Sequence, residues 1–449
     1  MESTVILVWK QGDSARLRFR LEWSPSVAAP LADSELKCRP KVLKDLGAPQ
    51  IPADLVRTAG TMLYQALEKH ESVRDALKAA TAAASKEHAP IYFHIDQSDA
   101  EAFPWEVLCD AEGAFLSLND RIPIARVVGS TRDGKEINRT FKLPVKVFAV
   151  LSAANVSAAA EWKALYETFK DITWGINIKI LVGEPELQAE IAKLAETDKR
   201  IEVGYVPADG NELLDQIRSY NPQLLHFFCH GNTASRPHLR IATKADWVRS
   251  ADEGSISLEP VQFQRLDDPA SEICIVVLNC CKSSVATGDL RSLAMSIIDQ
   301  GPAFPAVIGM REPVSSQDAS LFSKAFYTSI FDRLEDFLAG TTQLSDIDWV
   351  GAMYAPRAKL AAARGDNKPL NDAAASAKEW TLPVIYIRPE PFRHRLVRKL
   401  TEAEQLEMVT KLDWLRQWQT MNKLNPSIPA NVLTQLEQEI AQIEAQLAA

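Results

Sequence analysis

The sequence predicts an α/β fold in which helices flank a mostly parallel sheet, with an N-terminal α+β portion before it and a C-terminal helical hairpin after it. Strand-like and helix-like segments alternate from about residue 144 to residue 387, and such alternation is typical of a parallel sheet with helices on both faces. Several strand-like segments are short and wholly apolar, as expected of strands that are buried on both faces.

The N-terminal portion, residues 1–140, mixes the two patterns. Polar and apolar side chains alternate over residues 16–21, which predicts a strand with one face in water. Residues 53–83 carry apolar side chains at helical spacing, so we expect a helix there. Three shorter elements are predicted after it: a strand over 90–96, a short helix over 103–108 and a strand over 122–127.

Residues 141–395 are predicted to form the main α/β domain. The predicted strands cover 145–151, 176–181, 201–206, 224–229, 273–278, 305–310 and 382–387. The predicted helices cover 158–170, 185–194, 213–220, 290–298 and 319–334. The segment 232–272 has few regular signals and carries several acidic residues, and a loop this long inside a compact domain is often functional. We also expect at least one flexible stretch within residues 338–380.

Residues 396–449 form the predicted helical hairpin. Thr401 and Glu404 match a capping box at a helix start, and the segment 425–429 breaks the helical pattern with two prolines. The second helix carries an apolar seam of heptad type, which either packs on the main body or docks a partner. This seam consists of Leu433, Leu436, Ile440, Ile443 and Leu447.

The composition narrows the class of protein. Hydrophobic residues make up 46% and charged residues 24% of the 449 residues, which is ordinary for a globular protein. A net charge of −9 argues against direct binding of nucleic acid, which usually needs a basic face. Six cysteines without a regular spacing indicate reduced thiols and a cytoplasmic location. No apolar stretch approaches the roughly 20 residues of a membrane helix, and the N-terminus lacks the basic start of a signal peptide.

Two apolar runs stop abruptly at reactive side chains. One run leads to His230 and Gly231, and the other leads to Cys280 and Cys281. Because the carboxyl ends of parallel strands meet at one edge of a sheet, we expect the histidine and the cysteine to lie close together there. An imidazole can take the proton of a thiol, and the thiolate is a strong nucleophile. The two runs therefore predict a Cys–His catalytic pair.

Within each run, one residue is the better candidate. His226 lies inside the apolar run rather than at its end, so we expect it to be buried and hydrogen-bonded. Neighbouring strand residues point to opposite faces, so only one of the two cysteines can meet His230. Cys281 is favoured because it lies nearer the exposed end, and Lys282 beside it would lower the pKa of the thiol.

Other chemistries fit the sequence less well. A zinc site built from Cys229, His230, Cys280 and Cys281 is disfavoured because neighbouring side chains diverge, whereas zinc motifs leave two or more residues between ligands. The chain has no Walker motif and no Gly-x-Gly-x-x-Gly motif for a nucleotide. It also lacks the Gly-x-Ser-x-Gly motif of many serine hydrolases. We therefore expect no metal and no cofactor.

The motifs and their order resemble the CHAT family of caspase-like peptidases. Residues 225–231 resemble the family's His-Phe-x-x-His-Gly segment, and residues 275–283 resemble the strand that ends in its nucleophilic cysteine, which falls on Cys281. Residues 306–318 resemble the next strand and its Pro-Val-x-x-x-Asp turn, although Met310 replaces a common aromatic residue. Further matches lie at 104–108, 115–118, 326–327 and 382–387.

The resemblance implies a caspase-hemoglobinase-like fold and cleavage of a protein substrate by a Cys–His dyad. Cys281 would attack the peptide carbonyl, and His230 would act as the base and then as the proton donor to the leaving amine. The backbone N–H groups of Gly231 and Cys281 would stabilise the oxyanion. The resemblance also implies an activating protein partner and a bacterial signalling or defence pathway.

Two residues are candidates for substrate preference. Asp289 lies close to Cys281 in the sequence and would favour a basic residue before the scissile bond. Arg311 is the nearest obvious cation and would favour an acidic residue instead.

Three functions compete. The sequence favours a regulated cysteine endopeptidase, and the alternative is a catalytically silent caspase-like adaptor that acts through its C-terminal hairpin. A third possibility is another thiol enzyme, such as a transferase. For the endopeptidase, we expect the segment 232–272 to cover the cleft in the free protein, and a partner bound to the hairpin to favour the open state.

Overall fold

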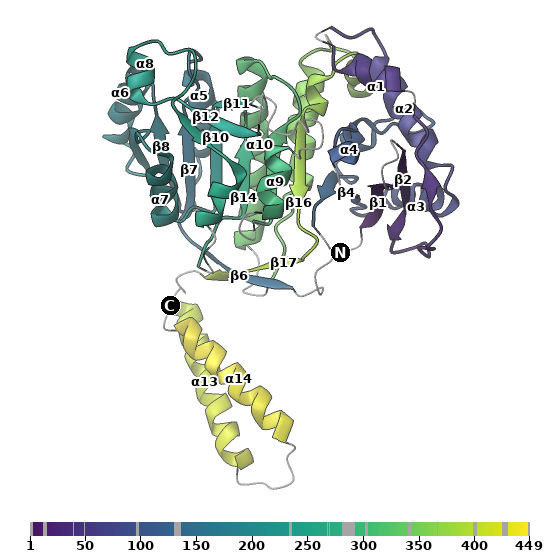
Figure 1. Cartoon of the computed structure of the whole chain (residues 1–449). Coiled ribbons are helices and arrows are strands. Elements are labelled where there is room, and N and C mark those ends of the chain that lie inside the picture. Colours follow the sequence, from purple (N-terminus) through teal and green to yellow (C-terminus); the bar gives the residue numbers. More distant parts are fainter. Residues whose placement is uncertain are drawn as a thin grey trace.

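One large sheet runs through the body of the protein, and a helical hairpin projects from it (Figure 1). The computed structural model describes residues 3–11, 16–38, 40–48, 50–95, 98–129, 136–232, 236–266, 268, 270–280, 292–300, 304–339, 344–365, 367–397, 402–423 and 430–447.

The sheet has twelve strands in the order β3-β2-β1-β4-β5-β16-β15-β14-β10-β7-β8-β9. Their bounds are β1 Thr4–Lys10, β2 Leu17–Trp23, β3 Ser34–Glu35, β4 Ile91–Ile95, β5 Ile124–Val127, β7 Val145–Leu151, β8 Ile176–Val182, β9 Ile201–Tyr205, β10 Leu224–Phe228, β14 Ile275–Leu278, β15 Ala306–Met310 and β16 Pro383–Ile387. The six strands from β15 to β9 are mutually parallel. The predicted mostly parallel sheet is confirmed.

Strand β16 joins this block to the N-terminal strands. It runs antiparallel to β15 and parallel to β5, and β4 and β1 continue the parallel pairing beyond β5. The strands of the N-terminal portion therefore belong to the same sheet as the main domain. The side chains of β10, β14, β15 and β16 are all buried, which explains why these strands read as continuous apolar runs.

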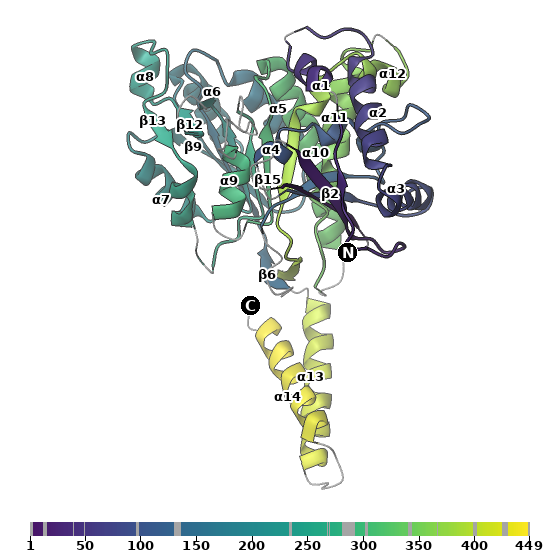
Figure 2. The ribbon, with the colours of Figure 1, turned by 45° about the vertical axis from the view of Figure 1, so that its right-hand side comes forward.

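The helices of the body flank this sheet (Figures 1 and 2). They are α1 Pro40–Leu46, α2 Leu55–Leu67, α3 Glu71–Ala83, α4 Ser98–Glu101, α5 Ala159–Phe169, α6 Pro185–Ala195, α7 Gly210–Tyr220, α8 Lys244–Val248, α9 Leu293–Gln300, α10 Ser316–Ala339, α11 Tyr354–Ala362 and α12 Leu370–Ala375. The projecting hairpin consists of α13 Glu402–Lys423 and α14 Ala430–Leu447. Short 3-10 helices cover Trp105–Val107, Leu116–Leu118, Pro260–Leu266, Gly351–Met353 and Glu379–Thr381.

The single helix expected over residues 53–83 is in fact two helices, α2 and α3, and His70 explains the break. The Nε2 atom of His70 lies 2.8 Å from the carbonyl oxygen of Ala32, so it donates a hydrogen bond there. Its Nδ1 atom is then free to accept from the backbone N–H of Val73, at 3.4 Å. His70 therefore caps the start of α3, a local role that apolar spacing alone does not reveal.

The segment 232–272 is not the irregular loop that the sequence suggested. It contains β12 (His238–Ile241), α8 and β13 (Ile256–Leu258), and β12 pairs with both β13 and β11 (His230–Asn232). Thr243 and Asp246 form a capping box at the start of α8. The carboxylate of the buried Asp246 also accepts hydrogen bonds from the backbone and hydroxyl of Ser255, at 3.0 and 2.7 Å. These polar contacts make the segment a folded subdomain rather than a free flap.

Two other regions differ from the expectations. The described parts of residues 338–380 are largely helical, in α11, α12 and two 3-10 helices, so the flexible stretch expected there is not seen among them. A two-stranded parallel ribbon of β6 (Ile137–Lys142) and β17 (Phe392–Val397) was not predicted. The ribbon lies at the base of the body, next to the hairpin (Figure 1).

The hairpin of α13 and α14 has a small core of its own. Leu412 and Leu415 of α13 pack with Leu436, Ile440 and Ile443 of α14. Lys411 pairs with Glu439 at 2.8 Å and Arg416 pairs with Glu444 at 2.6 Å. The apolar seam of α14 therefore packs on α13, which corrects both earlier interpretations: in its described residues the seam neither covers the body nor remains open to a partner. Within the described part of the chain, no helix is both long and apolar enough to cross a membrane.

Asp246 should make the subdomain sensitive to acid. Burial alone would raise the pKa of Asp246, but the hydrogen bonds from Thr243 and Ser255 hold it below its ordinary value. Its ionised form therefore contributes stability above pH ~4, the ordinary range of an aspartate, and the contribution is lost as the pH falls further. We expect Asp246→Asn to lower the free energy of unfolding by about 1–3 kcal/mol at pH 7, and the difference from wild type to shrink at pH 3.

Urea unfolding at the two pH values measures this effect. Asp252→Asn is the matched control, because Asp252 is an exposed acid of the same segment. A difference between wild type and Asp246→Asn that stays constant from pH 7 to pH 3 would contradict the assigned role.

Candidate active site

The carboxyl ends of four neighbouring parallel strands form one edge of the sheet. In spatial order these are β7, β10, β14 and β15. Ala154 follows β7, His230 follows β10, Cys280 follows β14 and Arg311 follows β15. The structure therefore brings His230 and Cys280 to the ends of two adjacent strands, β10 and β14. In open α/β sheets, this is the edge at which ligands bind.

A hydrogen bond fixes the protonation of the His230 ring. Its Nε2 atom lies 2.7 Å from the carbonyl oxygen of Ala154. A carbonyl oxygen only accepts, so Nε2 carries the proton in the neutral ring, and Nδ1 keeps a lone pair. The residue is half-buried and begins β11. His230 is thus held in a tautomer that can accept a proton through Nδ1.

Cys280 turns its sulfur into the core. Its Sγ atom lies 3.2 Å from Sγ of Cys229 and donates to the carbonyl oxygen of Phe227 at 3.4 Å. The side chain is 1% exposed, and both cysteines are free thiols. Cys280 is therefore not accessible to a substrate at the edge of the sheet.

The other predicted site residues are placed as follows. Cys281 and Asp289 lie outside the described residues. Gly231 lies in β11, opposite Leu239 of β12. The backbone N–H of Arg311 donates to the carbonyl oxygen of Leu382, and its guanidinium donates to that of Ala102 at 3.1 Å. Arg311 reaches the correct edge of the sheet, but its guanidinium is already hydrogen-bonded.

A buried polar network lies beneath this edge. The side-chain amide of Asn279 lies 3.0 Å from Oε1 of Glu161, 3.0 Å from the carbonyl oxygen of Ala319 and 3.0 Å from the hydroxyl of Ser323. Ser323 also donates to Glu161. Glu161 lies on α5 and Ser323 on α10, and both are fully buried. The network thus fixes the end of β14, two residues before Cys281.

His226 belongs to the same network. The ring is fully buried, as expected, and its Nε2 atom lies 3.1 Å from Oε1 of Glu161, although the ring is not aligned for a direct hydrogen bond. It packs edge-on against Tyr327, with ring centroids 5.6 Å apart. Burial and the nearby Glu161 raise the pKa of the Tyr327 hydroxyl well above its usual value. Sequence reasoning missed this network; the one available signal was Asn279 at the end of an apolar strand.

A second buried acid, Glu101, holds the backbone at Ser292. Oε2 of Glu101 accepts a hydrogen bond from the backbone N–H of Ser292 at 3.1 Å, just before α9. Oε1 accepts from the hydroxyl of Tyr386 at 2.7 Å. Burial raises the pKa of Glu101. Cys280 and Ser292 are therefore both buried, Cys280 in the apolar core and Ser292 against the carboxylate of Glu101.

No group of three or more His, Cys, Asp or Glu side chains is placed to hold a metal ion among the residues that the structure describes. The chemistry that the described residues of this edge can support is proton transfer at His230, next to the end of β14.

Comparison with known proteins places the chain in a family. A family model described as the CHAT domain matches residues 53–335. Among solved structures, the chain is similar to the Arg-specific cysteine proteinase gingipain R, with 12% identity, a TM-score of 0.39, and coverage of 80% of this chain and 72% of that one. It is also similar to the complex of pro- and mature domains of RgpB from Porphyromonas gingivalis, with 9% identity, a TM-score of 0.37, and coverage of 78% and 77%.

A third similar structure is the Saccharomyces cerevisiae separase–securin complex, with 14% identity and a TM-score of 0.32. The match covers 84% of this chain but 21% of that one. Among curated proteins, no sequence matches this chain.

The Glu161 network should support both stability and the protection of Cys280. In Glu161→Ala, the buried amide of Asn279 and the hydroxyl of Ser323 lose their shared acceptor. We expect a loss of about 2–5 kcal/mol in the free energy of unfolding and faster alkylation of Cys280 by iodoacetamide, measured by mass spectrometry under native conditions.

Glu190→Ala provides the control, because Glu190 is an exposed glutamate on the neighbouring α6. Unchanged stability and unchanged protection of Cys280 in Glu161→Ala would show that the network has no anchoring role.

Proposed function

Because this chain belongs to the CHAT-domain family, we propose that it is a regulated cysteine endopeptidase in which Cys281 is the nucleophile and His230 the base. The observation that carries the proposal is the buried Cys280, whose sulfur packs on Cys229 at the end of β14. Because the sulfur of Cys280 is directed into the core, Cys280 is not available to a substrate. This supports Cys281, the other cysteine of the pair, as the proposed nucleophile.

The proposed reaction uses the tautomer of His230. Its Nδ1 atom takes the proton of the Cys281 thiol, and the thiolate attacks the carbonyl carbon of the scissile peptide. The backbone N–H groups of Gly231 and Cys281 stabilise the resulting oxyanion. The imidazolium returns its proton to the leaving amine as the C–N bond breaks, which leaves a thioester. Water then hydrolyses the thioester, with His230 as the base, and the free thiol is restored.

Substrate preference is proposed to involve the charged residues at the same edge. Arg311 follows β15, which is the strand next to β14. It therefore lies at the same row of strand ends as the proposed dyad, where it could bind an acidic side chain of the substrate near the scissile bond. To bind it, the guanidinium exchanges the carbonyl oxygen of Ala102 for a carboxylate, which is the stronger, charge-assisted partner. Asp289 stays a prediction for a basic preference.

We further propose that an activating protein partner docks on the outer face of α13. This face carries Leu406, Val409, Trp414 and Met421, which are 70%, 43%, 59% and 62% exposed. Trp414 also stacks on Trp418. Aromatic residues and Met are enriched in protein interfaces, and the hairpin projects from the body, so this face is accessible (Figure 2). The partner surface that fits it is apolar, such as one face of an amphipathic helix.

The exposed face of α13 also favours the second candidate function, a catalytically silent adaptor that works by docking alone. The bacterial signalling or defence setting stays a prediction from the family resemblance.

Single substitutions in the dyad test the proposed chemistry. We expect Cys281→Ala and His230→Ala each to lower the rate of peptide cleavage by about three orders of magnitude or more, since each removes an indispensable group. The measurement is the cleavage of a peptide library and of a cell extract, with sequencing of the new protein termini.

Cys280→Ala is the matched control, and we expect it to retain most of the activity if it folds. EDTA should leave the wild-type rate unchanged. An inactive but folded Cys280→Ala beside an active Cys281→Ala would reverse the assignment, and an absence of cleavage by the wild type in the presence of its partner would favour the adaptor.

Paired substitutions on the hairpin separate docking from folding. We expect Trp414→Glu with Met421→Glu to leave the melting temperature unchanged but to abolish stimulation of cleavage by the partner. Leu436→Glu with Ile443→Glu should instead unfold the hairpin, because both side chains are buried against α13. Circular dichroism and the cleavage assay read the two effects. Full activity without any partner, unchanged by removal of residues 401–449, would contradict the proposed control.

A further inference from the structure

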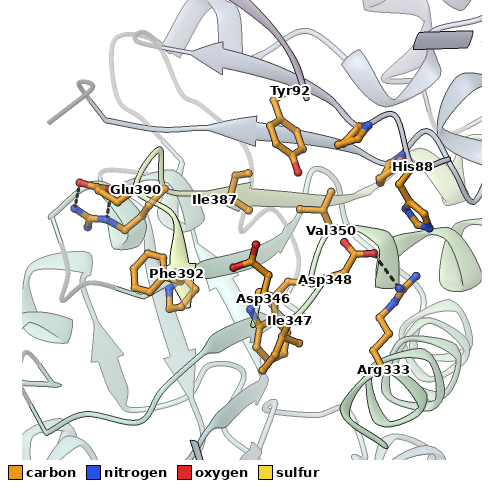
Figure 3. Close-up of a pocket in the computed structure, with 15 residues that line it drawn as sticks. His88, Tyr92, Arg333, Asp346, Ile347, Asp348, Val350, Ile387, Glu390 and Phe392 are labelled. Atoms are coloured by element: carbon orange, nitrogen blue, oxygen red, sulfur yellow. Dashed lines mark hydrogen bonds and ion pairs between the residues drawn. The ribbon is translucent and has the colours of Figure 1, made fainter. Parts of the chain in front are cut away.

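A cavity of about 450 Å³ lies away from the candidate active site. It lies between the strands β4, β5 and β16 and the segment 346–350 that follows α10 (Figure 3). Pro305 and Ile387, at one end of the β15–β16 pair, line it. Arg311 and Leu382 lie at the other end of this pair, at the edge that carries His230. The length of a strand therefore separates the two places.

The walls of this cavity are mainly apolar. Three aromatic side chains, Tyr92, Trp349 and Phe392, contribute to the lining and are at least nine-tenths buried. Ile347 and Ile387 add aliphatic surface. A volume of this size with mainly apolar walls is typical of pockets for small organic molecules, which range over about 300–1,000 Å³.

The charged groups around the cavity are joined in ion pairs, and one guanidinium is shared. Asp348 is bound to Arg333 at 2.9 Å, and Glu390 is bound to Arg388 at 3.1 Å. The guanidinium of Arg393 is shared between two carboxylates, Asp346 at 3.0 Å and Glu136 at 3.4 Å. Asp346 thus shares its guanidinium partner with Glu136.

Asp346 is the carboxylate that faces the cavity. Figure 3 shows it directed into the space, toward the hydroxyl end of Tyr92. Its side chain is 37% exposed. Burial raises the pKa of Asp346, and the nearby Glu136 and Asp348 raise it further, against the effects of Arg393 and of the amino terminus. A cationic group placed in the cavity would give the carboxylate of Asp346 a partner in addition to the shared Arg393.

We propose that the cavity binds a small organic monocation, namely an ammonium or amidinium group on an apolar or aromatic body. The cationic group donates hydrogen bonds to the carboxylate of Asp346, and the body packs against the aromatic walls, where the ring faces also attract the charge. This site is distinct from the Cys–His edge, and its occupation can be measured without any peptidase activity.

Binding of 2-phenylethylamine to the full chain tests the proposal, with 2-phenylethanol as the neutral analogue of equal shape. We expect isothermal titration calorimetry to show binding of the amine, and at least ten-fold weaker binding of the alcohol. Asp346→Asn should weaken the amine at least ten-fold. Val350→Phe should abolish binding, because the larger side chain fills the cavity that Val350 lines.

Asp171→Asn is the control, because Asp171 is an exposed acid that does not line the cavity. Melting temperatures establish that each variant is folded. The proposal is wrong if no binding of the amine is detected at a concentration of about 10 mM, which is ten times the dissociation constant of a weak, millimolar ligand. It is also wrong if the alcohol binds as tightly as the amine. Binding like that of wild type by both folded variants, Asp346→Asn and Val350→Phe, would contradict it as well.

Discussion

The joint between β5 and β16 depends on charges that are buried completely. Arg126 of β5 is 0% exposed, and its guanidinium binds both carboxylate oxygens of Glu106, at 3.1 and 2.9 Å. It also donates to the backbone carbonyl oxygens of Glu101 and Phe103. Close by, the guanidinium of Arg357 bridges the carbonyl oxygens of Ile124 and Pro383, at 3.4 and 3.3 Å. These contacts hold β5 to β16, the strand that joins the N-terminal strands to the block from β15 to β9.

Burial of charged groups costs free energy unless each group has its ion-pair or hydrogen-bond partners. Burial lowers the pKa of Arg357 to about 10, because its guanidinium has carbonyl oxygens rather than a carboxylate as partners. Removal of one member of a buried ion pair leaves an uncompensated charge and typically costs about 3–5 kcal/mol. The same group of residues also holds the chain just before α9, since Glu101 accepts a hydrogen bond from Ser292. Stability of the sheet and placement of α9 are therefore linked through one cluster.

The sequence predicted what periodicity and strand ends can encode. The strand at β7 and the helix at α6 follow from apolar spacing, and the apolar run before His230 is a buried strand, as predicted. The remainder depends on contacts between residues far apart in the chain. The sequence around Asn279 does not indicate that its side chain binds Glu161, which lies 118 residues earlier. The sequence around Arg126 likewise does not indicate which carbonyl oxygens accept its hydrogen bonds. The capping of α3 by His70 was missed for a similar reason. The ring is oriented by its hydrogen bond to the carbonyl oxygen of Ala32, which is distant in the sequence.

The way in which the hairpin is attached has a mechanical consequence. The chain enters α13 from β17, and β17 is tied to β6 by a parallel ladder of six residue pairs. β6 leads directly into β7, and the loop after β7 supplies the carbonyl oxygen that holds His230. A pull on the hairpin along the strand direction loads this ladder in shear, so that its hydrogen bonds share the load instead of opening one by one. The ribbon thus works as a clamp, and the most direct route for tension from the hairpin ends at the imidazole.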